Sequence, residues 1–324
     1  MTLSLPGIGL LAADGEVLNN IADQAGAAVS IGLGVLLAMI LFSYKTRAGV
    51  IARATTKESV RQPLFLLLMG LGLLLIIVNT YLPFFSLGQD IKMLKECGLA
   101  TIQISGLLIA IWTASTSIAS EIEGKTAMTL LSKPITRRQF VLGKYVGILQ
   151  AATALIVPLM IVFCLFLVLK VAYDARESAK EVLPFLEQGT SMLSSTYLNE
   201  VLHVIPGFVL IFFEISVVAA ISVAISTRAP MVVNMSSCLA IFIVGHITPQ
   251  LVEAGSIQIE IVEFMARFIA TILPNLESLS MSTAASTGQP IPTEYLLSAL
   301  GYTAAYAGAA IFLSFYLFED RDLA

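Results

Sequence analysis

Charged residues are scarce in this sequence. Asp, Glu, Lys and Arg make up only 12% of its 324 residues, while 57% of the residues are hydrophobic and the mean hydropathy is +0.89. Soluble domains carry roughly 25% charged residues. The composition therefore excludes a soluble globular domain and predicts an all-α, polytopic membrane bundle, in which each transmembrane helix needs about 20 apolar residues.

Histidine and cysteine are rare as well, which removes most metal and redox chemistry. The two histidines, His203 and His246, belong to no H-E-x-x-H motif of the kind that metalloproteases use. The three cysteines, Cys97, Cys164 and Cys238, lie far apart and form no C-x-x-C pair. We expect no metal site and no cofactor in this chain, and we interpret the cysteines as scattered packing residues.

A complete phosphate-binding loop is missing, although Gly-Lys-Thr at 124–126 resembles the end of one. The motif G-x-x-x-x-G-K-[ST] needs an earlier glycine, and the chain has Ala119 there. Glu121 and Glu123 would also place negative charge beside a triphosphate. Because the sequence lacks a G-x-S-x-G nucleophile elbow too, we expect no catalytic residues, no ATP site and no nucleic-acid partner.

Long apolar runs are abundant instead. Seven of them are long enough to cross a membrane as helices. The predicted spans are 25–43, 63–83, 99–118, 143–170, 205–226, 231–249 and 293–317. Pro230, at the end of a short turn after the fifth span, is placed to start the sixth helix, because the first residue of a helix needs no N–H.

The basic residues are divided unequally between the two sets of connecting segments. Twelve of the 18 Lys and Arg fall on one side of the seven predicted spans and six on the other. Cytoplasmic loops carry an excess of Lys and Arg, so the richer side is predicted to be cytoplasmic. This orientation places an N-terminal segment, residues 1–24, outside the cell and the C-terminus in the cytoplasm.

Two further segments have helical patterns without the character of a span. In 50–61, Arg53, Lys57 and Arg61 share one helical face, which predicts a short elbow helix at the cytoplasmic surface; a solvated basic loop is the alternative. In 258–273, apolar residues recur at helical spacing between charged ones. That pattern predicts an amphipathic helix on the outer leaflet.

Glu214 is the one ionisable residue well inside a predicted span. A buried carboxylate is costly in a membrane, which suggests a place on a transport path, but a protonated glutamate that hydrogen-bonds to a neighbouring helix explains it equally well. In the last span, Gly301, Ala305 and Ala309 recur every four residues. Small residues at this spacing permit close helix contact, either within the subunit or across a dimer.

The segment between the third and fourth spans is a dense cluster of charged and polar side chains between two long apolar runs. It carries acidic residues near its start and apolar residues later, and Pro134 stops it. Thr136 and Gln139 form a capping-box pattern for the next helix. We expect 119–135 to form a short, ordered protrusion on the cytoplasmic face.

This segment resembles a motif of ABC type-2 transporter permeases, in the branch of nitrous-oxide-reductase maturation and gliding-motility permeases. E-I-E-G-K-T-A-M-T-L-L-S-K-P-I-T-R-R-Q-F-V-L-G-K is similar to the family pattern E-x-E-x-G-T, L-L, P-[IV]-[ST]-R and G-K, and departs from it by the insertion of Lys125. The matching positions are Glu121, Glu123, Gly124, Thr126, Leu130, Leu131, Pro134, Ile135, Thr136, Arg137, Gly143 and Lys144.

The resemblance implies a permease domain of six helices at 47–324, which leaves 25–46 as an additional N-terminal span. It also implies that the chain forms a homodimer or heterodimer of permeases, and that it pairs with a separate ABC ATP-binding subunit, which holds ATP and Mg. The segment 119–135 would be the coupling helix that contacts this subunit. The implied coupling residues are Glu121, Glu123, Gly124, Thr126, Leu130, Leu131, Pro134 and Arg137.

These observations favour the permease subunit of an ATP-driven exporter, a multi-pass protein of the inner (plasma) membrane. Its substrate is not identified by the sequence. A non-transporting membrane subunit, which transmits the motion of an ATPase to a partner or serves as a scaffold, is the alternative. A third hypothesis, a membrane-embedded enzyme, has little support in the residues. The basic character of 119–135 also has a plainer explanation, the positive-inside rule.

Overall fold

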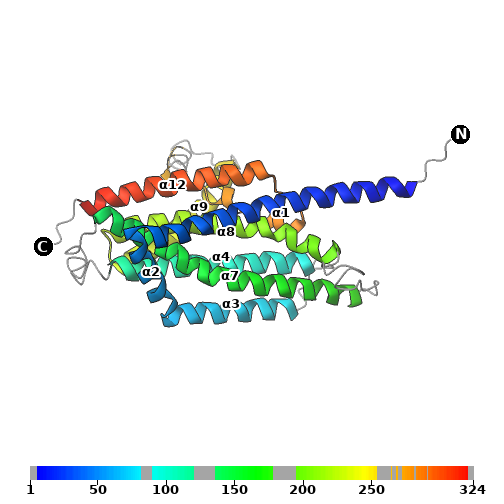
Figure 1. Ribbon diagram of the computed structural model, residues 1–324, viewed down its shortest axis with the longest axis horizontal. Coiled ribbons are helices and arrows are strands. Elements are labelled where there is room, and N and C mark those ends of the chain that lie inside the picture. Colours follow the sequence, from blue (N-terminus) through cyan, green and yellow to red (C-terminus); the bar gives the residue numbers. More distant parts are fainter. Residues whose placement is uncertain are drawn as a thin grey trace.

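The computed structural model describes residues 6–81, 90–119, 136–177, 195–253, 264, 268, 272–280, 282–289 and 291–319. Every regular element in these residues is helical, and the long helices run nearly side by side (Figure 1). The first half of the chain forms α1 (Pro6–Lys45), α2 (Arg47–Val60), α3 (Pro63–Tyr81), α4 (Asp90–Ala114) and the π-helical turn η1 (Ser115–Ala119). The second half forms α7 (Arg137–Glu177), α8 (Ser195–Ser226), α9 (Met231–Glu253), the 3₁₀ turn η2 (Glu277–Leu279), α11 (Ser282–Thr287) and α12 (Thr293–Glu319).

Six helices of the described residues are long and apolar enough to cross a membrane, which confirms the polytopic helical bundle. They are Ile21–Lys45, Pro63–Tyr81, Asp90–Ile118, Arg137–Asp174, Tyr197–Ser226 and Thr293–Phe318. Each contains most of one predicted span. The remaining predicted span, 231–249, lies in α9, whose apolar part, Met231–Ile247, is a shorter helix.

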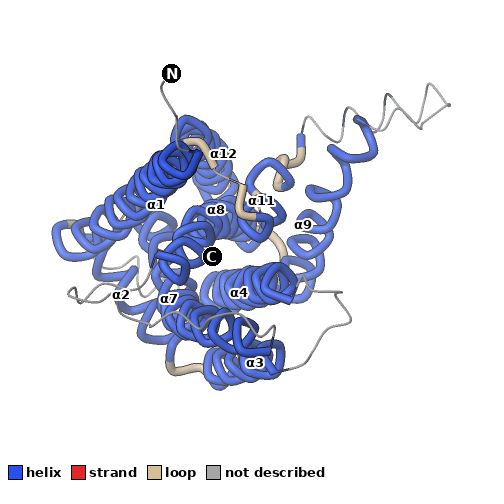
Figure 2. The backbone as a smooth tube through the Cα atoms, turned by 90° about the vertical axis from the view of Figure 1, so that its right-hand side faces the viewer, coloured by secondary structure: helices blue, strands red, loops and turns tan. Residues whose placement is uncertain are grey.

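α8 and α4 form the centre of the bundle. In an apolar 18-residue stretch of each helix, 83% of the residues are buried in α8 and 67% in α4, against 17% in α1. The view along the bundle shows α3, α7, α1, α12 and α9 placed around these two helices (Figure 2). A helix that is apolar on every side belongs in the interior, and α8 buries consecutive residues over Val217–Ala220.

The short helix predicted at 50–61 lies within α2 and packs on the first turns of α7. Gly143 and Gly147 of α7 permit this contact, because a Cβ atom would lie 2.6 Å from the Ala48 carbonyl oxygen at the first position and 2.7 Å from the Ala52 carbonyl oxygen at the second. The face of α2 that is buried consists of Ala48, Gly49, Ala52, Thr55 and Ser59. α2 crosses one end of the bundle (Figure 1), which we call the α2 end; α7 and α9 begin there and α12 ends there.

The segment before α12 is fastened to α9 and α12. The Leu276 N–H donates to the Gly245 carbonyl oxygen at 3.3 Å, and the Asn275 N–H donates to the Tyr302 hydroxyl at 2.8 Å. The amphipathic helix predicted at 258–273 lies mostly outside the described residues. Three of its apolar side chains are described and exposed, and they recur at four-residue spacing: Phe264, Phe268 and Ile272.

Candidate functional site

Glu214 is fully buried on the central helix α8 and contacts residues of two other helices. The Nε2 atom of Gln103, on α4, donates a hydrogen bond to Glu214 Oε2 at 2.6 Å. The Nε2 atom of His246, on α9, lies 3.3 Å from Glu214 Oε1. These three residues, which we call the Glu214 cluster, place a carboxyl group, an amide and an imidazole together inside the bundle.

His246 is the more exposed residue of the ion-pair contact in the Glu214 cluster. Nδ1 of His246 lies 3.0 Å from the Phe242 carbonyl oxygen. The two nitrogens of the imidazole thus face a backbone carbonyl group of α9 on one side and the carboxyl group of Glu214 on the other. His246 is 22% exposed while Glu214 is 1% exposed, so the imidazole side of the cluster is the accessible one.

A second buried polar cluster lies nearer the α2 end. Asn234 of α9 donates from Nδ2 to Ser115 Oγ in η1 at 2.8 Å and to Ser222 Oγ in α8 at 3.0 Å. The Cys238 thiol lies 3.3 Å from Asn234 Oδ1. We call these residues the Asn234 cluster. A buried amide with its hydrogen bonds made fixes the helices that supply the partners relative to one another.

The helices that lead into and out of 120–135 are joined by a buried lysine. Lys144 of α7 donates from Nζ to Ser117 Oγ in η1 at 2.7 Å, and its ammonium lies 5.6 Å from the centre of the Phe140 ring. Its side chain is only 3% exposed. η1 is a π-helical turn at the end of α4, a feature that is frequent at functional sites.

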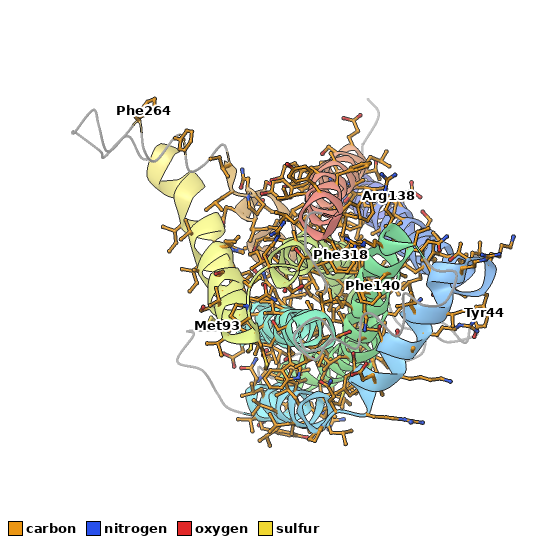
Figure 3. The ribbon with its side chains drawn as sticks, turned by 90° about the vertical axis from the view of Figure 1, so that its left-hand side faces the viewer. Tyr44, Met93, Arg138, Phe140, Phe264 and Phe318 are labelled. Carbon is orange, nitrogen blue, oxygen red and sulfur yellow. The ribbon has the colours of Figure 1, made fainter. Side chains whose placement is uncertain are left out.

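Two arginines hold the C-terminal end of α12. Arg137 donates from Nη1 to the Phe318 carbonyl oxygen at 3.0 Å, and Arg228, in the turn between α8 and α9, donates from Nε to the Leu317 carbonyl oxygen at 3.0 Å. The Phe140 and Phe318 rings stack with their centres 5.7 Å apart (Figure 3). Cations stabilise the last carbonyl groups of a helix in this position. We call this set of contacts the α12 clamp.

The structure describes only two of the residues named from the sequence as functional. Arg137 lies in the α12 clamp and Glu214 lies in the Glu214 cluster, at different levels of the bundle. The capping box that starts α7 is confirmed: the Gln139 N–H donates to Thr136 Oγ1 at 3.3 Å, and the Thr136 N–H donates to Gln139 Oε1 at 3.2 Å. The other coupling residues lie outside the described part of the chain: Glu121, Glu123, Gly124, Thr126, Leu130, Leu131 and Pro134.

Sequence reasoning singled out Glu214 but missed its partner Gln103. A glutamine within an apolar run was the available signal, since a polar side chain in a span needs a partner. Among the described residues, no group of three or more His, Cys, Asp or Glu side chains is arranged to hold a metal ion. The side chains present in the Glu214 cluster are suited to binding a proton or a small polar group.

The membrane-length helices, the polar clusters between them and the joined helix ends define a multi-pass helical membrane protein of the transporter type. Residues 49–323 match the family model described as ABC-2 family transporter protein. This match covers most of the chain, so the protein belongs to the ABC-2 transporter family and is a transmembrane subunit of an ABC transporter. The search of curated proteins gave no match to the chain. α1 precedes the matched region.

Proposed function

We propose that this chain is the permease subunit of an ATP-driven exporter, whose transport step is driven by a separate ATP-binding subunit that contacts 119–135. One observation carries the proposal: the same three helices meet in both buried polar clusters. α4 with its continuation η1 supplies Gln103 and Ser115, α8 supplies Glu214 and Ser222, and α9 supplies His246 and Asn234. A displacement at one cluster is therefore carried along rigid helices to the other.

The length of helix between the two clusters gives the distance over which such a displacement would be transmitted. Gln103 and Ser115 are twelve residues apart, as are Asn234 and His246, which corresponds to about 18 Å of helix. η1 directly precedes 120–135, and Lys144 ties it to the helix that follows. Movement of the coupling segment would reach η1 first, then the Asn234 cluster, and then the carboxyl group of Glu214, which we propose to lie on the transport path.

We propose further that the α2 end faces the cytoplasm, with the N-terminus outside, in the inner (plasma) membrane. The predicted excess of Lys and Arg on this side supports that orientation. ATP and Mg would be bound by the partner ATPase. The motif at 121–144 supports membership of the branch of nitrous-oxide-reductase maturation and gliding-motility permeases.

We propose that two permease chains, as a homodimer or heterodimer, form the working unit. The small-residue stripe of α12 supports this, because the described structure does not use it inside the subunit. Gly301, Ala305 and Ala309 are exposed, and a Cβ atom at Gly301 would meet no atom within 4 Å. Such a surface is suited to close contact with another helix.

Purification of the tagged chain from native membranes tests the proposal. We expect an ATP-binding subunit to co-purify, and we expect the complex in liposomes to hydrolyse ATP faster when its substrate is supplied in fractions of a lipid and metabolite extract. Absence of any ATPase would contradict the proposal. An ATPase whose rate no fraction changes would instead favour the non-transporting subunit that transmits motion to a partner.

A further inference from the structure

α1 stands partly away from the bundle and leaves a groove between itself, α2 and α7. Only 17% of the residues in its apolar 18-residue stretch are buried. The groove has a volume of about 470 Å³, and its wider end is lined by Ser43, Tyr44, Arg53, Thr56 and Gln150. These residues come from three helices, and Tyr44 marks this side of the α2 end in Figure 3.

The groove continues along α1 as an apolar channel. A second cavity, of about 190 Å³, lies between α1, α7 and α8 and shares Leu36, Thr153 and Val157 with the first. Except for Thr153, its lining consists of apolar side chains and glycine, among them Val29 and Phe208. The two cavities therefore form one elongated site with a polar end at α2 and an apolar remainder.

Among the described residues, Arg53 is the only charged one that lines either cavity. Its guanidinium lies 4.8 Å from the centre of the Tyr44 ring, and no ion pair is formed by it within the described residues. Beneath it the polar floor is neutral and internally bonded: Thr56 Oγ1 donates to Gln150 Oε1 at 3.0 Å, and Gln150 Nε2 donates to Ser43 Oγ at 2.6 Å. Because the guanidinium of Arg53 is charged and the polar groups next to it are neutral, this end of the groove favours an anionic group.

We propose that this groove binds a phospholipid with an anionic headgroup, from the leaflet at the α2 end. The phosphate would contact Arg53, and one acyl chain would lie along α1 between Leu36 and Val157. A free phosphate would use only the polar end, whereas a lipid fills both ends of the site and places its chains against the exposed apolar face of α1, which includes Leu33, Leu37 and Ile40. Basic pockets between transmembrane helices are suited to such headgroups. α1, which lies outside the matched family region, supplies one wall of the site.

Native mass spectrometry of the purified chain tests the proposal without ATP or transport. The detergent-solubilised protein would be titrated with phosphatidylglycerol and, separately, with phosphatidylcholine. We expect saturable binding of one phosphatidylglycerol per chain and weaker binding of phosphatidylcholine. Arg53→Gln should weaken phosphatidylglycerol binding about fivefold, as expected for one cation near an anionic headgroup.

Two further variants separate this site from general surface charge. Lys57→Gln makes the same charge change one turn further along the basic face of α2, at an exposed residue that is not among the lining residues of either cavity, and should leave binding unchanged. Val157→Phe fills the apolar channel and should weaken binding of both lipids while Arg53 is retained. Equal loss in Arg53→Gln and Lys57→Gln, or unchanged binding in Val157→Phe, would overturn the proposal. Competition by inorganic phosphate would also overturn it, if phosphate displaced phosphatidylglycerol as effectively as another lipid does.

Discussion

At the scale of single residues, the bundle depends on a few polar side chains that are buried with their partners. Glu214, Asn234 and Lys144 are all enclosed, and each contacts a polar group from another helix. A buried polar group without a partner destabilises the fold, because the interior of a membrane offers it no other hydrogen-bonding group. Replacing the hydrogen-bond partner therefore measures the contribution of each buried residue better than replacing the buried residue itself.

Gln103→Leu should destabilise the protein by about 1–3 kcal/mol, because it leaves Glu214 Oε2 without its hydrogen-bond donor. Thermal unfolding in detergent measures this, with the fluorescence of the single tryptophan, Trp112, as the signal. Ile104→Ala is the control, since Ile104 is the neighbouring residue on α4 and is 51% exposed. Equal unfolding temperatures for the two variants would show that the amide does not stabilise the carboxyl group.

Lys144→Met should separate ATP hydrolysis from transport while the protein still inserts. Methionine fills a similar volume but cannot donate to Ser117, so η1 and α7 lose the bond that joins them across 120–135. Because removing a buried charge also removes its desolvation cost, we expect little loss of stability. ATP hydrolysis by the complex in liposomes, compared with uptake into the same liposomes, measures the coupling.

Arg138→Met is the matched control for Lys144→Met. It makes the same charge change six residues earlier on α7, at a side chain that is exposed. Hydrolysis and transport should stay in their original ratio in this variant. If Lys144→Met preserves the ratio equally well, the lysine has no part in coupling.

At the scale of helices, the contact between α2 and α7 is set by glycine. Cβ atoms at Gly143 and Gly147 would lie 2.6 and 2.7 Å from backbone carbonyl oxygens of α2, which cannot move aside as a flexible side chain can. The Thr56 hydroxyl oxygen also lies 3.2 Å from the Gly147 carbonyl oxygen. α2 is consequently packed into the bundle on one face, while its basic face, with Lys57 and Arg61, remains exposed.

Gly147→Ala should lower the free energy of unfolding by about 1–3 kcal/mol, because the new methyl group would lie 2.7 Å from the Ala52 carbonyl oxygen. This cost exceeds the gain of up to about 1 kcal/mol that alanine brings to a helix interior. Gly70→Ala in α3 carries the same gain without the collision, since a Cβ atom there meets nothing within 4 Å. Thermal unfolding should therefore shift in opposite directions for the two variants.

At the scale of the whole molecule, the sequence predicted the helices better than their contacts. The apolar runs and the capping box at Thr136 are local patterns, and the structure confirms six spans and the start of α7. Contacts such as that of Gln103 with Glu214 join residues far apart in the chain, and no local pattern encodes them.

The orientation of the whole bundle can be measured by cysteine labelling. In a background with Cys97, Cys164 and Cys238 replaced by alanine, Met128→Cys should be protected from a membrane-impermeant maleimide added to intact cells. Thr190→Cys should react, because the excess of basic residues places position 128 in the cytoplasm and position 190 outside. The reverse pattern would invert the proposed orientation, and labelling of both after permeabilisation is the control for access.

The α12 clamp has a consequence for how the protein is made. α12 is the last of the described helices, and its final carbonyl groups accept hydrogen bonds from Arg137 and Arg228, which lie much earlier in the chain and are synthesised first. Until α12 has inserted, both arginines lack these acceptors and Phe140 lacks the ring on which it stacks. The packing around the start of α7, next to 120–135, is thus completed only after α12 has inserted. On the proposed function, a chain that lacks α12 would present an incomplete docking surface to the ATP-binding subunit.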